Sequence, residues 1–290
     1  MDFWAWSNPL FRTFLYLSTF GSVGIILFNF HFARYQSLST STYCVKLLQK
    51  SAVVGIAASV GSLLSIAGSM GGDVSSAFKI EFLKLVFGMK SGWALMLALV
   101  GFFILIVFDK NATQLRHVMC LLGSLMILSS FTIYGHSTTA GFLSQLLLFI
   151  HLIAIAYWLG SLLPFRWMCL SNDRENLTLI ALKFGRLAIT YISILLITGF
   201  GFAYILLGDL SALISTDYGN VLLAKITSVL ILLSLGALNK FRFVPSIERG
   251  STAGIRRLRI AINAEIFLAI TILVISSVLT TSINLPVVSS

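Results

Sequence analysis

The sequence predicts an all-α membrane protein, a polytopic bundle of eight transmembrane helices with both termini outside the cytoplasm. Hydrophobic residues make up 58% of the 290 residues, charged residues only 10%, and the mean hydropathy is +0.97. A soluble domain carries about 25% charged residues, so this chain has too little charge to cover itself with polar surface. It is also too apolar to remain disordered. Composition therefore predicts a single integral membrane domain over residues 1–290.

The expected helices follow from runs without charged side chains, because a helix needs about 20 apolar residues to cross a hydrocarbon core of about 30 Å. Residues 117–165 contain no Asp, Glu, Lys or Arg. That run is too long for one crossing, and the polar, glycine-flanked segment 135–141 predicts the turn that divides it. The last two runs each admit one charge, Lys225 and Glu265. The predicted helices cover residues 13–33, 51–72, 91–108, 117–134, 142–165, 187–208, 218–239 and 260–282.

Basic residues predict the orientation of these helices. Of the 20 Lys and Arg residues, 15 lie in the connections after the first, third, fifth and seventh helices, and 5 lie on the other side. Cytoplasmic connections carry the excess of Lys and Arg, so both termini are expected outside the cytoplasm. The net charge of +10 is therefore a consequence of topology, and no nucleic-acid partner is expected.

Two connections are expected to contact membrane lipid. The most basic one, residues 240–259, is expected against anionic headgroups on the inner side. The outer connection, residues 71–90, is expected to lie on the membrane surface as an amphipathic helix. The apolar side of that helix would carry Phe78, Phe82, Leu85 and Val86.

No residue pattern indicates an enzyme. The chain has no GxxxxGK[ST] loop to hold phosphates and no connection long enough for a soluble catalytic domain. ATP therefore does not drive this protein from within the chain. The three cysteines, Cys44, Cys120 and Cys169, have no metal-binding spacing, and we interpret them as apolar packing residues.

Histidines are the first candidates for metal ligands, because imidazole binds copper, zinc and haem iron. His136 lies in the predicted outer turn, and His151 follows it in the outer half of the fifth helix. Met70, at the outer end of the second helix, adds a soft thioether that suits Cu(I). The alternative for each histidine is a cap or a hydrogen bond to a carbonyl. His31 and His117 fall near the inner ends of the first and fourth helices.

Polar residues inside the helices are candidates for a transport pathway, because a charge within the bilayer is costly. Lys225 follows Tyr218 by seven residues on one helix face, in the outer half, where it lines a cavity or extends to the headgroups. Glu265 lies in the inner part of the eighth helix, near the depth of Asn239. It takes part in transport or pairs with a nearby cation. The cations at that depth are Lys240, Arg186 and Arg259.

Aromatic and glycine positions continue the pattern of the fifth helix. Trp158 lies two turns below His151 on one face, and it either lines a pathway or only packs. Gly160 is expected to allow a close crossing with another helix.

The ordered set of these residues resembles the copper resistance protein D (CopD) family. His151 to Leu162 matches H-L-x-x-x-x-x-W-x-G-x-L, and Thr216 to Lys225 matches T-x-Y-G-x-x-L-x-x-K. The Gly-His-Ser turn around His136 is similar to that family's turn. The resemblance runs from about residue 115 to the end, and the first three helices match only in layout.

The resemblance implies a multi-pass protein of the bacterial inner membrane that handles copper. It implies a permease that moves copper ions from the periplasm to the cytoplasm, with His136 and His151 at the receiving end. It also implies a periplasmic copper-binding protein of the CopC type as partner. This chain has no methionine-rich outer loop and no fused copper-binding domain, which leaves the delivery of copper open.

Two other functions fit the residues. The four histidines, two near each face, fit a di-haem membrane cytochrome for transmembrane electron transfer. Its inner pair would be His31 with His117, and its outer pair His136 with His151. The third hypothesis is a non-transporting subunit for copper homeostasis.

Overall fold

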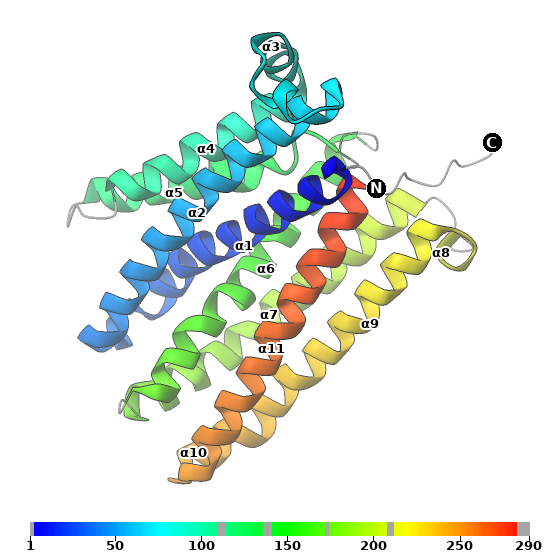
Figure 1. The fold of residues 1–290 in the computed structure, drawn as a ribbon. Helices are drawn as coiled ribbons and strands as arrows, with labels where there is room; N and C mark the ends of the chain where they lie inside the picture. The colour runs from blue at the N-terminus through cyan, green and yellow to red at the C-terminus, as the bar shows by residue number, and fades with distance from the viewer. Residues whose placement is uncertain are drawn as a thin grey trace.

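The computed structural model describes residues 3–108, 114–135, 138, 141–171, 174–207 and 212–282. Helices make up this part of the chain, and it contains no strand, so the all-α prediction is confirmed. The elements are packed as a bundle of long helices (Figure 1). In chain order they are α1 (Phe3–Phe32), η1 (Ala33–Tyr35), α2 (Leu38–Gly71), η2 (Ser75–Phe78), α3 (Ile80–Gly88), α4 (Lys90–Phe108), α5 (Gln114–Ser130), α6 (Gly141–Leu170), α7 (Arg174–Leu207), α8 (Ala212–Ser215), α9 (Asp217–Leu238), η4 (Asn239–Phe243), α10 (Val244–Glu248) and α11 (Thr252–Thr281).

Among the described residues, seven helical segments are long and apolar enough to cross a membrane, so the chain is a multi-pass membrane protein. The predicted helix 117–134 corresponds to α5, which has only 17 residues. It packs along α4 and returns toward the end of the bundle at which α1 begins (Figure 1). Tyr134 contacts Arg12 of α1 at that end. The count of eight crossings stays a prediction, as does the side on which the termini lie.

The helices are longer than the predicted runs. α1 starts ten residues earlier than expected, and α2 and α7 each start thirteen residues earlier. Charged residues near the ends of a membrane helix reach the headgroups without interrupting the backbone hydrogen bonds, so hydropathy understates helix length. Two of these long helices begin with a serine cap, since Ser37 accepts from Thr40 N and Ser251 accepts from Gly254 N.

The outer connection differs from its prediction. It contains η2 and the short helix α3 instead of one amphipathic helix, and Phe78 belongs to η2. Val86 is fully buried, whereas Phe78 and Leu85 are exposed, so the four apolar residues do not share one side. Hydrogen bonds from Ser76 hold the pKa of Asp73 in this connection below its usual value.

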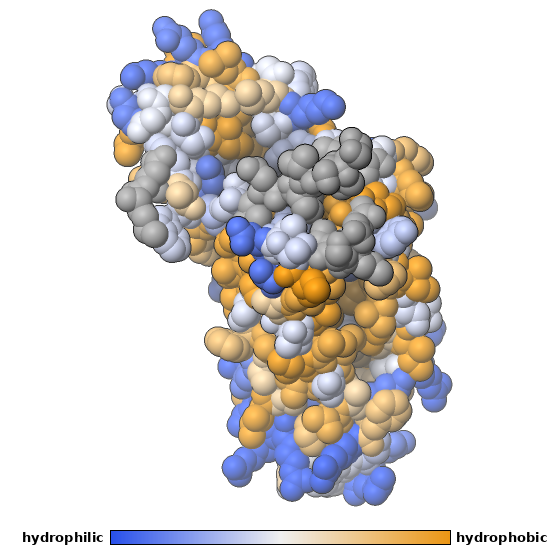
Figure 2. Space-filling view, turned by 90° about the vertical axis from the view of Figure 1, so that its right-hand side faces the viewer, coloured by the Kyte–Doolittle hydropathy of each residue, from blue (hydrophilic) through white to orange (hydrophobic). Residues whose placement is uncertain are grey.

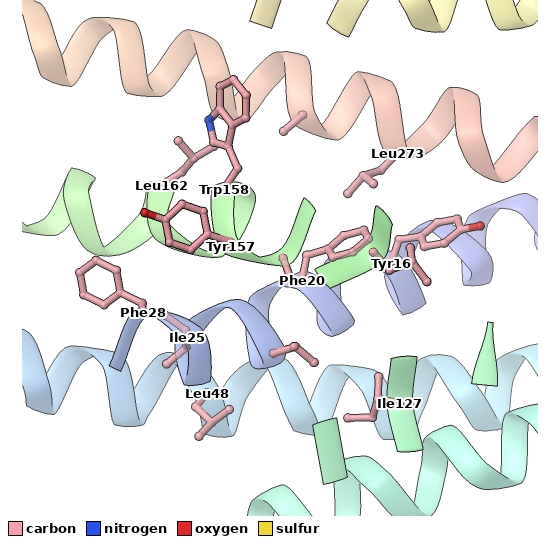
Figure 3. Close-up of a cluster of buried hydrophobic side chains, with 14 of the residues drawn as sticks. Tyr16, Phe20, Ile25, Phe28, Leu48, Ile127, Tyr157, Trp158, Leu162 and Leu273 are labelled. Carbon is pink, nitrogen blue, oxygen red and sulfur yellow. The ribbon is translucent and has the colours of Figure 1, made fainter. Parts of the chain in front are cut away.

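Helix α1 lies at the centre of the bundle and contacts α2, α5, α6 and α11. Figure 3 shows buried side chains of α1 meeting those of α2 and α6. The crossing of α1 with α6 is very close, because a Cβ on Gly160 would lie 2.2 Å from Gly24 Cα. The close crossing expected at Gly160 is therefore confirmed, and its partner is Gly24.

Helices α7 and α9 have little of their surface covered. In the most apolar stretch of each crossing helix, only 6% of the residues of α7 and 11% of those of α9 are buried within the described chain. The share is 39–61% in the other crossing helices. Figure 2 shows hydrophobic side chains over the middle of the visible face and hydrophilic ones at its lower end. This distribution fits a molecule whose middle faces lipid tails.

Candidate functional site

The predicted outer ligand His151 lies on α6 and points toward α7. Its Nδ1 atom lies 3.1 Å from the Leu195 carbonyl oxygen and 3.3 Å from Thr198 Oγ1. A carbonyl oxygen only accepts, so Nδ1 donates and Nε2 keeps its lone pair. Gly199 provides room, since a Cβ there would lie 2.8 Å from His151 Cε1. A metal-binding histidine is commonly oriented by a hydrogen bond of this kind.

The structure does not test the other two predicted ligands as partners of His151. His136 lies outside the described residues. Met70 lies in the last turn of α2, where it is partly buried against the hydrophobic core. Within the ranges that the structure describes, no group of three His, Cys, Asp or Glu side chains could hold a metal ion. The outer ligand set therefore stays a prediction.

Glu265 is deeply buried in the bundle. Its side chain is 2% exposed. Helix α11 begins eight residues earlier than predicted, so Glu265 lies at the middle of this helix. Asn239 Nδ2 donates to Glu265 Oε1 at 2.7 Å, which confirms that the two residues lie at one depth. No cation forms an ion pair with Glu265 in the part of the chain that the structure describes. The ion pair found there joins Lys79 to Asp73.

Two further features shape this carboxylate site. The Trp158 indole lies close enough to Glu265 to interact electrostatically with it, and its ring extends from α6 toward α11 (Figure 3). Gly236 on α9 makes space for the ring, since a Cβ there would lie 2.7 Å from Trp158 Cζ2. Asn239 begins the π-helical turn η4, a rare conformation that is frequent at functional sites. Its Oδ1 atom is buried and has no hydrogen-bond partner among the residues that the structure describes.

Tyr218 and Lys225 both lie in the outer half of α9. Thr216 caps this helix by accepting from Gly219 N at 3.0 Å, and Tyr218 in the first turn is buried in a small apolar cluster. Lys225 is half-buried. It lies close enough to His151 and Tyr16 to interact electrostatically with both. The role of Lys225 in a transport pathway stays a prediction.

Arg12 is a polar residue that the sequence analysis missed. It is 8% exposed on α1, and its guanidinium carbon lies 5.1 Å from the Tyr16 ring centre, 4.7 Å from Phe131 and 5.1 Å from Tyr134. Nη1 donates to the Tyr134 hydroxyl, and Nε has no partner within the described part of the chain. Aromatic faces attract a desolvated cation, which explains how Arg12 is tolerated inside the bundle. Arg12 directly precedes the first charge-free run, so the sequence indicated a charge at the end of a helix and not a buried one.

The two inner histidines have different surroundings. His31 Nε2 lies 3.0 Å from the Tyr191 hydroxyl, and its ring packs edge-on against Tyr157. Tyr157 in turn stacks on Tyr191 with ring centres 3.8 Å apart. These neighbours belong to α6 and α7, whereas His117 is exposed on α5. Nothing in this arrangement supports an inner haem ligand pair.

Comparison with protein families accounts for most of the chain. A family model described as copper resistance protein D matches residues 179–279, and one described as copper resistance protein D-like, N-terminal domain, matches residues 2–145. The chain belongs to the copper resistance protein D family. It is therefore a copper resistance membrane protein. The family match also covers the first three helices, for which the sequence alone had indicated only a similar layout. No curated protein and no solved structure matches the chain.

The two copper resistance matches leave residues 146–178 between them. This interval holds most of α6, including His151, Trp158 and Gly160. Helix α6 contacts α1 of the first matched part and α7 and α11 of the second. The copper resistance protein therefore has its candidate ligand His151 on the helix that joins its two matched parts.

Proposed function

We propose that this protein is a permease that carries copper ions from the periplasm to the cytoplasm across the bacterial inner membrane. The observation that carries the proposal is the arrangement of polar groups along α6. His151 and Trp158 are seven residues apart, so they share a helix face and are separated by about 10 Å along the axis. His151 presents a free Nε2 lone pair, and Trp158 contacts the buried Glu265.

The roles follow from the chemistry of these groups. The imidazole Nε2 is a ligand for copper as the ion leaves the outer water. Once the ion is inside the bundle, its positive charge is costly in the low-dielectric interior, and the Glu265 carboxylate offsets that cost. Asn239 holds the carboxylate in position through its hydrogen bond, and the Trp158 indole lies nearby. Copper is the cargo in this scheme, and it undergoes no reaction.

Delivery of copper involves the outer end of α6. The family resemblance implies a periplasmic copper-binding protein of the CopC type as donor, with His136 as the first acceptor and Met70 as a further soft ligand. Tyr218 and Lys225 line the same outer region on α9. Since 15 of the 20 basic residues lie on the opposite side, that side faces the cytoplasm.

Copper uptake into vesicles that contain the purified protein tests the proposal. The variant His151→Asn keeps a side-chain donor for the Leu195 carbonyl but has no atom equivalent to Nε2. We expect it to fold normally and to lose uptake, and we expect the same of Glu265→Gln. Gly201→Ala is a matched control, because its added methyl group meets Leu147 at an ordinary 3.5 Å. Wild-type protein that moves no copper, or unchanged uptake in both site variants, would refute the proposal.

A further inference from the structure

Four basic side chains lie around the inner end of α7. Arg186 directly precedes a predicted apolar run, and Arg34 and Lys240 each directly follow one. These three residues therefore lie at one depth, the boundary between the hydrocarbon core and the headgroups. Lys183 precedes Arg186 by three residues, so the two are neighbours on the surface of α7. Hydrophilic side chains cover this end of the molecule, the lower end in Figure 2.

Contacts in the structure bring these charges together on α7. The centre of the Tyr35 ring lies 4.7 Å from the Arg34 guanidinium carbon and 4.6 Å from Lys183 Nζ. One aromatic ring therefore holds two cations close together. Lys240 of η4 crosses α7 at Gly185, where a Cβ would lie 3.6 Å from Lys240 Cγ.

The contacts lie on two different flanks of α7. Successive residues of a helix are rotated by about 100°, so Lys183 and Gly185 lie on nearly opposite sides of the axis. Arg186 lies between them and is exposed. The outward face of α7 at its inner end therefore has Arg186 at its middle, Lys183 on one flank and Lys240 on the other.

Acidic side chains do not balance these charges. The ion pair found among the residues that the structure describes lies in the outer connection between α2 and α3. Within that part of the chain, no carboxylate forms an ion pair with any of the four basic side chains. Lys183 and Lys240 are half-buried, so water screens their repulsion only in part. A bound anion would offset that repulsion.

An uncovered apolar surface continues from these charges toward the outer side. Ile197 and Phe200 follow Arg186 by 11 and 14 residues, about three and four helical turns, so they lie on the same face of α7. Their side chains are 71% and 73% exposed. A basic site at headgroup depth thus leads into an open apolar surface, which is complementary to a molecule with an anionic head and apolar chains.

We infer that the inner end of α7 binds an anionic phospholipid. Its phosphate diester accepts hydrogen bonds from Lys183 and Arg186, with Arg34 and Lys240 at the sides, and its acyl chains lie along the exposed face of α7. A soluble anion would gain only the first of these interactions, so the geometry favours a lipid. The bound lipid joins η1, α7 and η4 at the membrane boundary. This binding does not depend on copper transport.

Native mass spectrometry of the full-length protein in a mild detergent tests the inference. The probe is dioleoyl phosphatidylglycerol, and the comparison is dioleoyl phosphatidylcholine, which has the same chains and no net charge. We expect phosphatidylglycerol to bind at least about tenfold more tightly, because each nearby basic residue attracts the anionic headgroup. Raising the salt concentration should reduce this difference.

Three double variants locate the site. Lys183→Gln with Arg186→Gln removes two of the four charges, and the Kd for phosphatidylglycerol should rise about 30-fold. Arg256→Gln with Arg257→Gln is the matched control, since it removes two exposed charges from the same side of the membrane, and its Kd should stay near the wild-type value. Lys183→Arg with Arg186→Lys keeps both charges and should also bind as the wild type does.

Other outcomes would overturn the inference. Equal Kd values for the two lipids would show that the basic residues do not select the headgroup. The same loss of affinity in the Arg256 and Arg257 control would indicate a general effect of charge, without a site on α7. Weak binding by the charge-preserving variant would mean that the fold, and not the charge, had changed. Displacement of phosphatidylglycerol by millimolar inorganic phosphate would identify a site for soluble anions.

Discussion

Alanine at position 160 would add a methyl group where α1 and α6 are in close contact. The new Cβ would lie 2.2 Å from Gly24 Cα, 2.6 Å from Gly24 C and 2.8 Å from Phe20 O. Carbon atoms make favourable contacts at about 3.5–4.0 Å, so the two helices must separate by at least about 1.3 Å. Backbone atoms form the contact, so a change of side-chain rotamer cannot relieve it.

The cost follows from this geometry. Overpacking a well-packed contact destabilises a protein by about 1–3 kcal/mol. Replacing glycine by alanine within a helix recovers up to about 1 kcal/mol through the intrinsic preference of the backbone. We therefore expect Gly160→Ala to lower the free energy of unfolding by about 1–2 kcal/mol. Gly24→Ala affects the same contact, so the double variant should lose less than the sum of the single losses.

Unfolding by SDS in mixed micelles, followed by far-UV circular dichroism, measures this difference. The control is Gly201→Ala, which receives the same backbone benefit without a clash, because its Cβ would lie 3.5 Å from Leu147 Cδ1. Gly201→Ala should match or slightly exceed the wild-type stability. A Gly160→Ala protein as stable as this control would refute the close crossing as a source of stability.

Three further outcomes are expected. Trp158→Phe keeps an aromatic ring over Gly236 but removes the polar indole N–H near Glu265, so unfolding by SDS should become easier by about 1 kcal/mol; equal stability would mean that the indole N–H contributes nothing. Arg12→Lys keeps the charge but loses the planar contact with three aromatic rings, and a loss of about 1–2 kcal/mol is expected by the same method. Hydrogen bonds from Ser76 lower the pKa of Asp73, so the outer connection should be most resistant to proteolysis above the usual Asp range and lose that resistance progressively as the pH falls from there through the lowered pKa. Asp73→Asn should remove this pH dependence, and an unchanged profile in the variant would contradict the assignment.

The helical fold could be predicted because the bilayer imposes it. Runs such as 91–108 need no tertiary information, and α4 begins within one residue of its prediction. Helix ends were less predictable, because a charge such as Lys46 lies in α2 beyond the apolar run. Gly160 could be recognised as a crossing residue, but its partner Gly24 could not, since the choice between glycines depends on how the helices pack.

The candidate site was predictable in its residues and less so in their contacts. Asn239 and Glu265 were expected at one depth, and a hydrogen bond joins them. A cation was one expected partner of Glu265 because a charge usually balances a buried carboxylate, whereas the hydrogen bond found here comes from the Asn239 amide. The Leu195 carbonyl that orients His151 has no sequence signal, because every residue carries a carbonyl.

The two sides of α6 differ in stiffness. On the side of α1, backbone meets backbone at Gly24 and Gly160, and sliding or widening there would disrupt many atoms together. On the side of α7, the crossing is as extensive but is made through side chains and hydrogen bonds such as that of His151 to the Leu195 carbonyl, and α7 and α9 are mostly uncovered elsewhere. Alternation between outward-open and inward-open states is therefore expected to move α7 and α9 against a fixed pair of α1 and α6. Amide hydrogen exchange should be faster in α7 and α9 than in α1, and copper should increase that difference if it drives the motion.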